Sequence, residues 1–240
     1  MAIPDISDIN TVPKLFWYNV ENYRDDITMW RKQRGVWESH TWGDYGNWSR
    51  DIGHALIAEG LKPGDKISIL SETRMEWVVL DMAIMGIGCI TAPVYPSNTE
   101  EQVKYIVKHS ESKVVFAEDQ EQLDKMLVIW KDLPMVKKIV VIDKYYPRNL
   151  PNVISLDGYR DLGQSHRGEN TGKFEERLKL VKPNDIISFT YTSGTTGNPK
   201  AGMFNSKNVI TVAKNLPDML PTYRTDLGIS YLPLSHIAER

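Results

Sequence analysis

The sequence has 240 residues, of which 41% are hydrophobic and 25% charged, and its formal net charge is -2. These proportions are ordinary for a globular protein, and a charge so near neutrality gives no general electrostatic reason to expect nucleic acid or an anionic membrane as a partner. The length allows one large domain or two modest ones. The single cysteine excludes an intramolecular disulfide, which fits a reducing, cytoplasmic location.

No targeting or membrane-spanning signal stands out. The N-terminus lacks the basic and then apolar layout of a signal peptide. The longest apolar run, residues 77–95, contains Asp81, Gly86, Gly88 and Pro93, so it divides into a helix and a strand. We therefore expect this run to form buried core, and we expect no transmembrane segment.

Residues 1–40 carry Trp17, Trp30 and Trp37 among charged residues, without a sustained periodicity. Two interpretations fit such a segment: a wrapping segment whose aromatic side chains dock on the domain, or an interfacial anchor that makes peripheral membrane contact. The first is favoured because no long amphipathic basic helix accompanies the tryptophans. We expect residues 1–40 to be an N-terminal wrapping segment.

From Thr41 onward, strands alternate with helices. Thr41 is a good N-cap, and Asp44 in the first turn complements the helix dipole. Helical periodicity then runs to about residue 60. Strands are predicted at residues 67–70, 89–94, 113–117, 138–142 and 186–191, and helices at 76–86, 99–110, 120–133, 174–181 and from 206 onward. This alternation predicts an α/β fold with a mostly parallel sheet flanked by helices.

Residues 145–173 show a weaker pattern, with at most a short helix at 157–162. We interpret them as an elaborated surface connection, because the strand that follows must still join the sheet. Residues 41–240 are accordingly predicted to be one domain.

The segment from Tyr191 to Gly202 is the strongest candidate for a functional site. It reads YTSGTTGNPKAG and lies between an apolar strand and a helix. Its glycines let backbone N–H groups form an anion-binding nest, its hydroxyls donate hydrogen bonds, and its lysine supplies a mobile positive charge. The candidate phosphate-binding residues are Thr192, Ser193, Gly194, Thr195, Thr196, Gly197 and Lys200. We expect this loop at the carboxyl end of its strand.

Two other interpretations of the loop are a Walker loop and an ordinary surface turn. A Walker loop ends in Gly-Lys-Ser/Thr, but here Lys200 follows Pro199 and precedes Ala201, so the hydroxyl that would hold magnesium is missing. An ordinary Ser/Thr/Gly surface turn remains the commonest origin of such composition. The ordered combination favours a functional loop.

The segment closely resembles the phosphate loop of the AMP-forming acyl-CoA synthetases, members of the adenylate-forming superfamily. The segments 61–66, 83–97 and 181–190 are similar to the N-terminal domain of that family, in the expected order. The segment 231–240, YLPLSHIAER, is similar to the next family motif in the form favoured by the long-chain fatty-acid branch. The resemblance covers the chain from about Thr41 onward.

The resemblance implies a reaction and roles for particular residues. A fatty acid would react with ATP to give acyl-adenylate and pyrophosphate, and coenzyme A would then form the thioester. Lys200 would stabilise the phosphates, and Thr192 would approach the Mg²⁺ ion. His236 would donate to an oxygen that gains charge; the alternative is an exposed or backbone-satisfied histidine at a helix start.

The family's later motifs for adenine, ribose and the catalytic C-terminal lysine do not occur in these residues. We therefore expect the chain to be an N-terminal portion of a synthetase, inactive alone, on which the remainder of the synthetase chain packs. Two alternatives stay open: a non-catalytic nucleotide- or acyl-binding module derived from the same fold, and a phosphotransferase that would release ADP instead of AMP.

Overall fold

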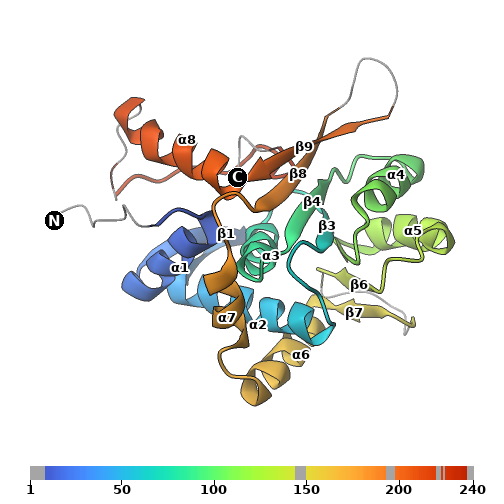
Figure 1. The fold of residues 1–240 in the computed structure, drawn as a ribbon, viewed down its shortest axis with the longest axis horizontal. Helices are drawn as coiled ribbons and strands as arrows, with labels where there is room; N and C mark the ends of the chain where they lie inside the picture. The colour runs from blue at the N-terminus through green and yellow to red at the C-terminus, as the bar shows by residue number, and fades with distance from the viewer. Residues whose placement is uncertain (1–8, 144–149, 193–197, 220–222, 224, 237–240) are drawn as a thin grey trace.

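The computed structural model describes residues 9–143, 150–192, 198–219, 223 and 225–236. Its centre is a seven-stranded sheet in the order β7-β6-β5-β3-β4-β8-β9 (Figure 1). Neighbouring strands pair in parallel except β8 and β9, which are antiparallel. The strands are β3 (Lys66–Leu70), β4 (Ile90–Val94), β5 (Val114–Ala117), β6 (Lys138–Val141), β7 (Val153–Ser155), β8 (Ile186–Thr192) and β9 (Lys200–Asn205). The mostly parallel sheet predicted from the alternation is confirmed.

Helices cover both faces of this sheet, as the sequence predicts. The helices are α1 (Val12–Asn22), α2 (Trp42–Ala58), α3 (Met75–Gly86), α4 (Glu100–Ser110), α5 (Gln120–Ile129), α6 (Leu156–Glu169), α7 (Lys173–Leu180) and α8 (Ser206–Met219), with a 3₁₀ turn at Trp130–Asp132. One core cluster joins a sheet face to α1, α2, α3, α6 and α7, and a second joins the opposite face to α4 and α5. Figure 1 shows α4 and α5 on one side of the strands and α2 and α3 on the other.

The strand side chains alternate between these two cores. In β5, Val114 and Phe116 enter the first cluster, whereas Val115 and Ala117 enter the second. All four side chains are fully buried. A strand that is buried on both faces appears in the sequence as a continuous apolar run, without the polar–apolar alternation of a half-buried strand.

The predicted start of α2 is confirmed in atomic detail. Thr41 Oγ1 accepts a hydrogen bond from Asp44 N at 3.1 Å, and Asp44 Oδ2 accepts one from Thr41 N at 2.9 Å. This reciprocal pair is a capping box, which satisfies two backbone donors that the first helical turn leaves unpaired.

Helix α6 corrects one prediction. The sequence predicted at most a short helix at 157–162, but α6 runs through Leu156–Glu169. The helix was underestimated because it contains Gly158, Gly163 and Gly168, and glycine disfavours helix. Gly163 has a packing role: a Cβ there would overlap the backbone carbonyl of Asp51 in α2. The glycine permits the close approach of α2 and α6.

The N-terminal segment is more structured than the sequence predicted. Helix α1 packs into the core through Phe16, Trp17 and Val20, so docking is observed for Trp17. It is followed by a hairpin of β1 (Ile27–Gln33) and β2 (Val36–Thr41). The docking interpretation is wrong for the two hairpin tryptophans, because Trp30 is 50% exposed and Trp37 60% exposed.

A turn of only two residues connects β1 and β2. Gln33 pairs with Val36, so only Arg34 and Gly35 connect the strands. Their φ angles are 48° and 83°, which is the left-handed conformation that a two-residue turn of this kind requires at both positions. The sequence signal was present in the Arg34-Gly35 pair but is weak without an asparagine or aspartate before the glycine.

A pair of histidines lies between α2 and α6. His54 Nδ1 lies 3.0 Å from His166 Nδ1, and the His54 side chain is 1% exposed. Burial, followed by the field of His166, lowers the pKa of His54 from 6.5 to about 4, although Glu175 opposes this shift. His54 is therefore neutral in the folded protein at neutral pH.

We expect this histidine to make the fold acid-sensitive. The pKa of His54 is lower in the folded protein than in the unfolded chain, so the unfolded chain binds this proton more tightly. The folded state therefore keeps its full stability above pH 6.5 and loses stability as the pH falls toward 4. The free energy of unfolding should drop by about 3 kcal/mol across this range, which chemical denaturation at several pH values would measure. His54→Gln should flatten the pH dependence and His236→Gln, at an exposed histidine, should not. An equal slope in the His54 variant and the wild type would contradict the assignment.

Candidate functional site

The candidate loop connects β8 to β9, and its two ends are paired. Thr192, the last residue of β8, lies opposite Lys200, the first residue of β9, in the antiparallel register. The predicted position at the carboxyl end of the β8 strand is therefore observed for the start of the loop. Lys200 was predicted within the loop, and it instead begins a strand. The candidate residues Ser193, Gly194, Thr195, Thr196 and Gly197 lie outside the described residues.

Helix α4 holds both ends of this loop. Tyr105 Oη donates a hydrogen bond to the carbonyl of Pro199 at 3.0 Å, next to Lys200. One helical turn later, His109 Nδ1 lies 3.0 Å from Tyr191 Oη, next to Thr192. Burial raises the pKa of Tyr191 to about 12, so this phenol stays protonated at neutral pH. The two contacts fix the positions from which the loop begins and ends.

These supports were not identified from the sequence. Tyr105 and His109 are four residues apart in a predicted helix, so they share one helix face, and their rings stack at a centroid distance of 5.5 Å. The spacing was available as a signal. Nothing in the sequence indicated which strand that face meets.

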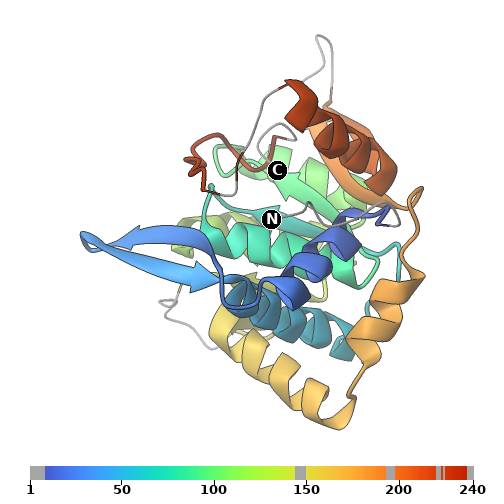
Figure 2. The same ribbon diagram turned by 90° about the vertical axis from the view of Figure 1, so that its left-hand side faces the viewer.

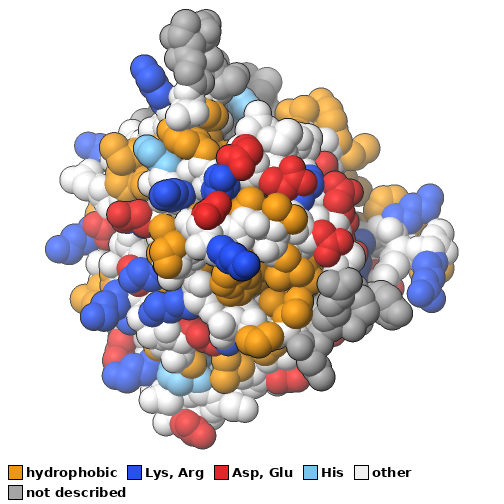
Figure 3. All heavy atoms as spheres, turned by 90° about the vertical axis from the view of Figure 1, so that its right-hand side faces the viewer, with side chains coloured by type: hydrophobic (Ala, Val, Ile, Leu, Met, Phe, Trp, Pro, Cys, Tyr) orange, Lys and Arg blue, Asp and Glu red, His pale blue; other side chains and the backbone are white. Residues whose placement is uncertain are grey.

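A hollow of about 440 Å³ lies between α4 and the β8–β9 pair. Its wall consists of Lys66, Tyr105, His109, Phe189, Pro199, Lys200, Ala201 and Met203. Lys200 is exposed, and no ion pair of its ammonium group occurs among the described residues. Figure 3 shows the face that carries α4 and α5, where both signs of charge are mixed with apolar side chains. The lysine is thus available to an anion from solvent.

The segment that contains His236 lies near the end of a neighbouring strand. Thr73, just beyond β3, donates its hydroxyl hydrogen to the carbonyl of Leu232 at 2.6 Å and accepts from Leu234 N at 3.1 Å. Leu234 is 4% exposed and belongs to the first core cluster. His236 N donates to the Pro233 carbonyl at 2.8 Å. Because β4 alone separates β3 from β8, this segment and the candidate loop both lie at the carboxyl edge of the sheet.

An ion-pair network reinforces the same edge. Arg74 contacts Glu76 at 2.8 Å, Glu118 at 3.3 Å and Asp143 at 2.8 Å, and these groups follow β3, β5 and β6. Burial acts to lower the pKa of Arg74, but the hydrogen bonds and charges of Glu76 and Asp143 outweigh burial and raise it. The arginine is saturated by carboxylates, so its charge stabilises the edge and is not available to a ligand.

The described residues do not form a magnesium site by themselves. Among them, no group of three or more His, Cys, Asp or Glu side chains could hold a metal ion. Mg²⁺ in nucleotide sites is commonly bound by one or two carboxylates together with phosphate oxygens. Thr192 offers a hydroxyl oxygen, and no carboxylate cluster accompanies it in this part of the structure.

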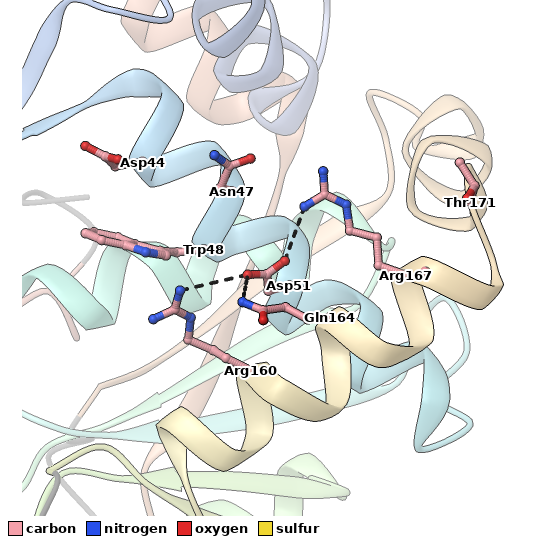
Figure 4. A pocket seen from close by; sticks show the side chains of 9 residues that line it. Asp44, Asn47, Trp48, Asp51, Arg160, Gln164, Arg167 and Thr171 are labelled. Atoms are coloured by element: carbon pink, nitrogen blue, oxygen red, sulfur yellow. Dashed lines mark hydrogen bonds and ion pairs between the residues drawn. The ribbon is translucent and has the colours of Figure 1, made fainter.

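A larger hollow of about 650 Å³ lies away from the loop, between α2 and α6 (Figure 4). Its centre is Asp51, which accepts from Gln164 Nε2 at 2.9 Å and pairs with Arg167 at 3.3 Å and Arg160 at 3.8 Å. Figure 4 shows these side chains converging on Asp51 from α6. Volume alone would favour this hollow, but its charges compensate one another and none of the candidate residues lies there. We interpret it as part of the helix packing.

Comparison with known proteins agrees with the geometry. A family model described as AMP-binding enzyme matches residues 16–240. The chain is 31% identical over 235 residues to the long-chain-fatty-acid–CoA ligase ACSBG1 of Bos taurus, covering 96% of this chain and 32% of that protein. It is 30% identical over 225 residues to the long-chain-fatty-acid–CoA ligase FadD15 of Mycobacterium bovis, covering 92% of this chain and 36% of that protein. The chain thus spans about a third of the length of these relatives.

Solved structures share the fold. The anthranilate CoA ligase AuaEII in complex with anthranoyl-AMP superposes with a TM-score of 0.69 at 22% identity, covering 85% of this chain and 36% of that chain. In the described residues, no helix is both long enough and apolar enough to cross a bilayer.

Proposed function

The chain belongs to the AMP-binding enzyme family, and we propose that in the full-length protein it activates a fatty acid, of long-chain type, with ATP. The acid first becomes an acyl-adenylate with release of pyrophosphate, and coenzyme A then displaces AMP to give acyl-CoA. The single observation that carries the proposal is the paired stem of the loop, where Thr192 and Lys200 face each other at the carboxyl edge of the sheet. Ligands of open α/β sheets gather at this edge.

Lys200 and the loop hydroxyls have the leading role in the first half-reaction. Negative charge grows on the departing pyrophosphate, and donors placed beforehand around the β- and γ-phosphates stabilise that charge more in the transition state than in the ground state. Lys200, Ser193, Thr195 and Thr196 are the proposed donors. The α4 contacts to Pro199 and Tyr191 support this role because they hold the loop ends before the nucleotide arrives.

His236 is proposed to act on the acyl side of the same edge. Its ring would donate to an oxygen of the reacting carboxylate or α-phosphate as charge develops there. The proposal is supported by the two hydrogen bonds with Thr73, one donated to Leu232 and one accepted from Leu234, that hold this segment beside the end of β3. Thr192 would offer its hydroxyl oxygen to a Mg²⁺ ion bound with the nucleotide, and the ion would offset part of the negative charge of the phosphates.

We propose that residues 41–240 are part of the larger, N-terminal domain of the synthetase, and that the remainder of that chain packs against it. Apolar side chains are exposed around β9 and beyond α8: Met203 is 65%, Leu227 86% and Ile229 87% exposed. Such side chains favour burial against another surface. The cytoplasmic location stays a prediction.

The test measures the products of ATP consumption by the full-length protein with a long-chain fatty acid and coenzyme A. AMP and pyrophosphate should form in step with acyl-CoA, and only when the fatty acid is present. ADP as the product would identify a phosphotransferase instead, and ATP binding without pyrophosphate exchange would identify a non-catalytic module.

Residues 1–240 alone should not turn over in the same assay. Positioning lowers such a barrier only when all reacting groups are held together, and the family's ribose-binding and C-terminal catalytic groups are not among these residues. Turnover by residues 1–240 at a rate comparable to the full-length protein would refute the proposed dependence on further motifs.

A further inference from the structure

The β1–β2 hairpin has one face turned to the protein and one turned to solvent. Across the ladder, Arg31 lies opposite Glu38, and both side chains are half-buried. Arg31 also reaches Glu76 of α3 at 3.2 Å. On the same face, the ring of His40 contacts the ring of Trp48 in α2 at a centroid distance of 5.1 Å. These contacts anchor the inner face of the hairpin to the body.

The outer face carries two tryptophans and a lysine. Trp30 and Lys32 are two residues apart on β1, and Trp37 lies directly opposite Lys32, so all three side chains share one face. Trp30 is 50% and Trp37 60% exposed, and Lys32 Nζ lies 5.9 Å from the centre of the Trp37 ring. Val36, at the turn, is 65% exposed.

The hairpin also projects from the body. Figure 2 shows β1 and β2 extending well beyond the helices and the sheet. Figure 3 views the molecule from the opposite side and shows the same projection with Lys and Arg side chains at its end. Lys32 and Arg34 are exposed there, and neither has an ion pair among the described residues, whereas the whole chain has a net charge of -2. The tip is a local basic site on a slightly acidic protein.

We propose that the outer face and tip of this hairpin dock on an anionic lipid bilayer. Tryptophan prefers the membrane–water interface, because its ring is apolar and its N–H remains hydrogen-bonded near the headgroups. Lys32 and Arg34 complement lipid phosphates and act over short distances at physiological salt. A projecting hairpin can reach a flat bilayer without the body colliding with it.

The small apolar area of the outer face favours a bilayer over a protein partner. Because Trp30 is 50% and Trp37 60% exposed, covering both buries roughly 150–300 Å² of their surface, which is small against the roughly 1,200 Å² of a stable protein interface. The same area is sufficient for shallow insertion into an interface when basic groups assist. Peripheral contact therefore requires neither a long amphipathic helix nor a membrane-spanning segment. The inference is independent of the proposed function, because it rests on the hairpin alone.

The test is co-flotation of the full-length protein with vesicles, in the absence of ATP, coenzyme A and free fatty acid. Vesicles of phosphatidylglycerol and phosphatidylcholine in equal parts should carry the protein, pure phosphatidylcholine should carry much less, and high salt should release it. Trp30→Ser with Trp37→Ser should lower the bound fraction at least tenfold. Lys32→Gln with Arg34→Gln should remove the preference for anionic vesicles. Brominated lipid should quench tryptophan fluorescence in the wild type more than in the tryptophan variant.

Matched controls separate the hairpin from general surface effects. Lys207→Gln with Lys214→Gln removes the same charge from exposed positions of α8. Val128→Ser with Leu180→Ser removes exposed apolar side chains, 72% and 65% exposed, from α5 and α7. Both control variants should float like the wild type. If the double tryptophan variant does not fold by circular dichroism, Trp37→Ser alone, at the more exposed site, makes the same test.

Three outcomes overturn the proposal: no flotation of the wild type with anionic vesicles, flotation of the hairpin variants equal to the wild type, or equal loss in the control variants. A fourth outcome would overturn membrane docking and assign the hairpin surface to a different partner. If sedimentation shows a dimer that the tryptophan variant abolishes while vesicle binding persists, the hairpin is an interface between copies of the chain.

Discussion

Replacing Lys200 with alanine in the full-length protein should slow adenylation about a hundredfold, equivalent to about 3 kcal/mol of transition-state stabilisation. Lys200 lies at the start of β9 with an exposed side chain, so the substitution removes a charge without opening a cavity in the core. The measurement is fatty-acid-dependent exchange of pyrophosphate into ATP. The ratio kcat/KM should fall, while circular dichroism and the melting temperature stay as in the wild type.

The matched control for this variant is Lys207→Ala at the start of α8. Lys207 is also exposed and lies seven positions further along the chain, but outside the loop and its paired stem. Its exchange rate should equal that of the wild type. An unchanged rate in the Lys200 variant would show that this lysine does not stabilise the phosphates, and an equal decrease in both variants would indicate a general effect of lost positive charge.

Gly163→Ala should destabilise the fold by about 3 kcal/mol, near the upper end of what overpacking usually costs. The added Cβ would overlap the carbonyl of Asp51, which is backbone and cannot swing aside like the end of a flexible side chain. Helix α6 would have to move away from α2, separating His54 from His166 and loosening the Asp51 ion pairs. The shift of the urea midpoint at an unchanged slope would measure the loss.

Gly168 provides the comparison within the same helix. A Cβ at Gly168 meets nothing within 4 Å, so Gly168→Ala should follow helix propensity and stabilise the protein by up to about 1 kcal/mol. The two variants make the same chemical change with opposite expected signs. A Gly163 variant as stable as the Gly168 variant would mean that the helices separate at little cost.

The sequence predicted those parts of the fold in which local signals and burial agree. The buried strands, the N-cap at Thr41 and the position of the loop after β8 all follow from nearby residues. Helix α6 was underestimated because its glycines reflect contact with α2, which is distant in sequence. The exposed tryptophans of the hairpin were misplaced for a related reason: composition shows that an aromatic residue is present, but only the strand register shows which face it occupies.

In the candidate site too, residues in local motifs could be proposed from the sequence, and residues that act through distant contacts could not. Thr192, Lys200 and His236 are candidates proposed from local motifs and the resemblance that they carry, whereas Tyr105 and His109 of α4 were not proposed. Their contribution arises from the sheet order, which places α4 beside a strand that follows much later in the chain. Residues such as Tyr105 and His109 have no local sequence motif, because the sheet topology determines which strand they contact.

The pairing of β8 with β4 has a consequence for the order of folding. Strand β4 joins β3, and β6 joins β5, across a single α-helix, whereas β5 joins β3 across α3, β4 and α4. Strand β8 must instead close the long excursion that includes α4, α5, α6 and α7 before Ser188 can pair with Thr91. That closure has the largest chain-entropy cost in the sheet, whereas β8 and β9 need only each other to form a hairpin. We therefore expect the paired stem of the candidate loop to form locally and to join the sheet late. A ligand that binds across the stem and the sheet edge would then stabilise the last step of assembly.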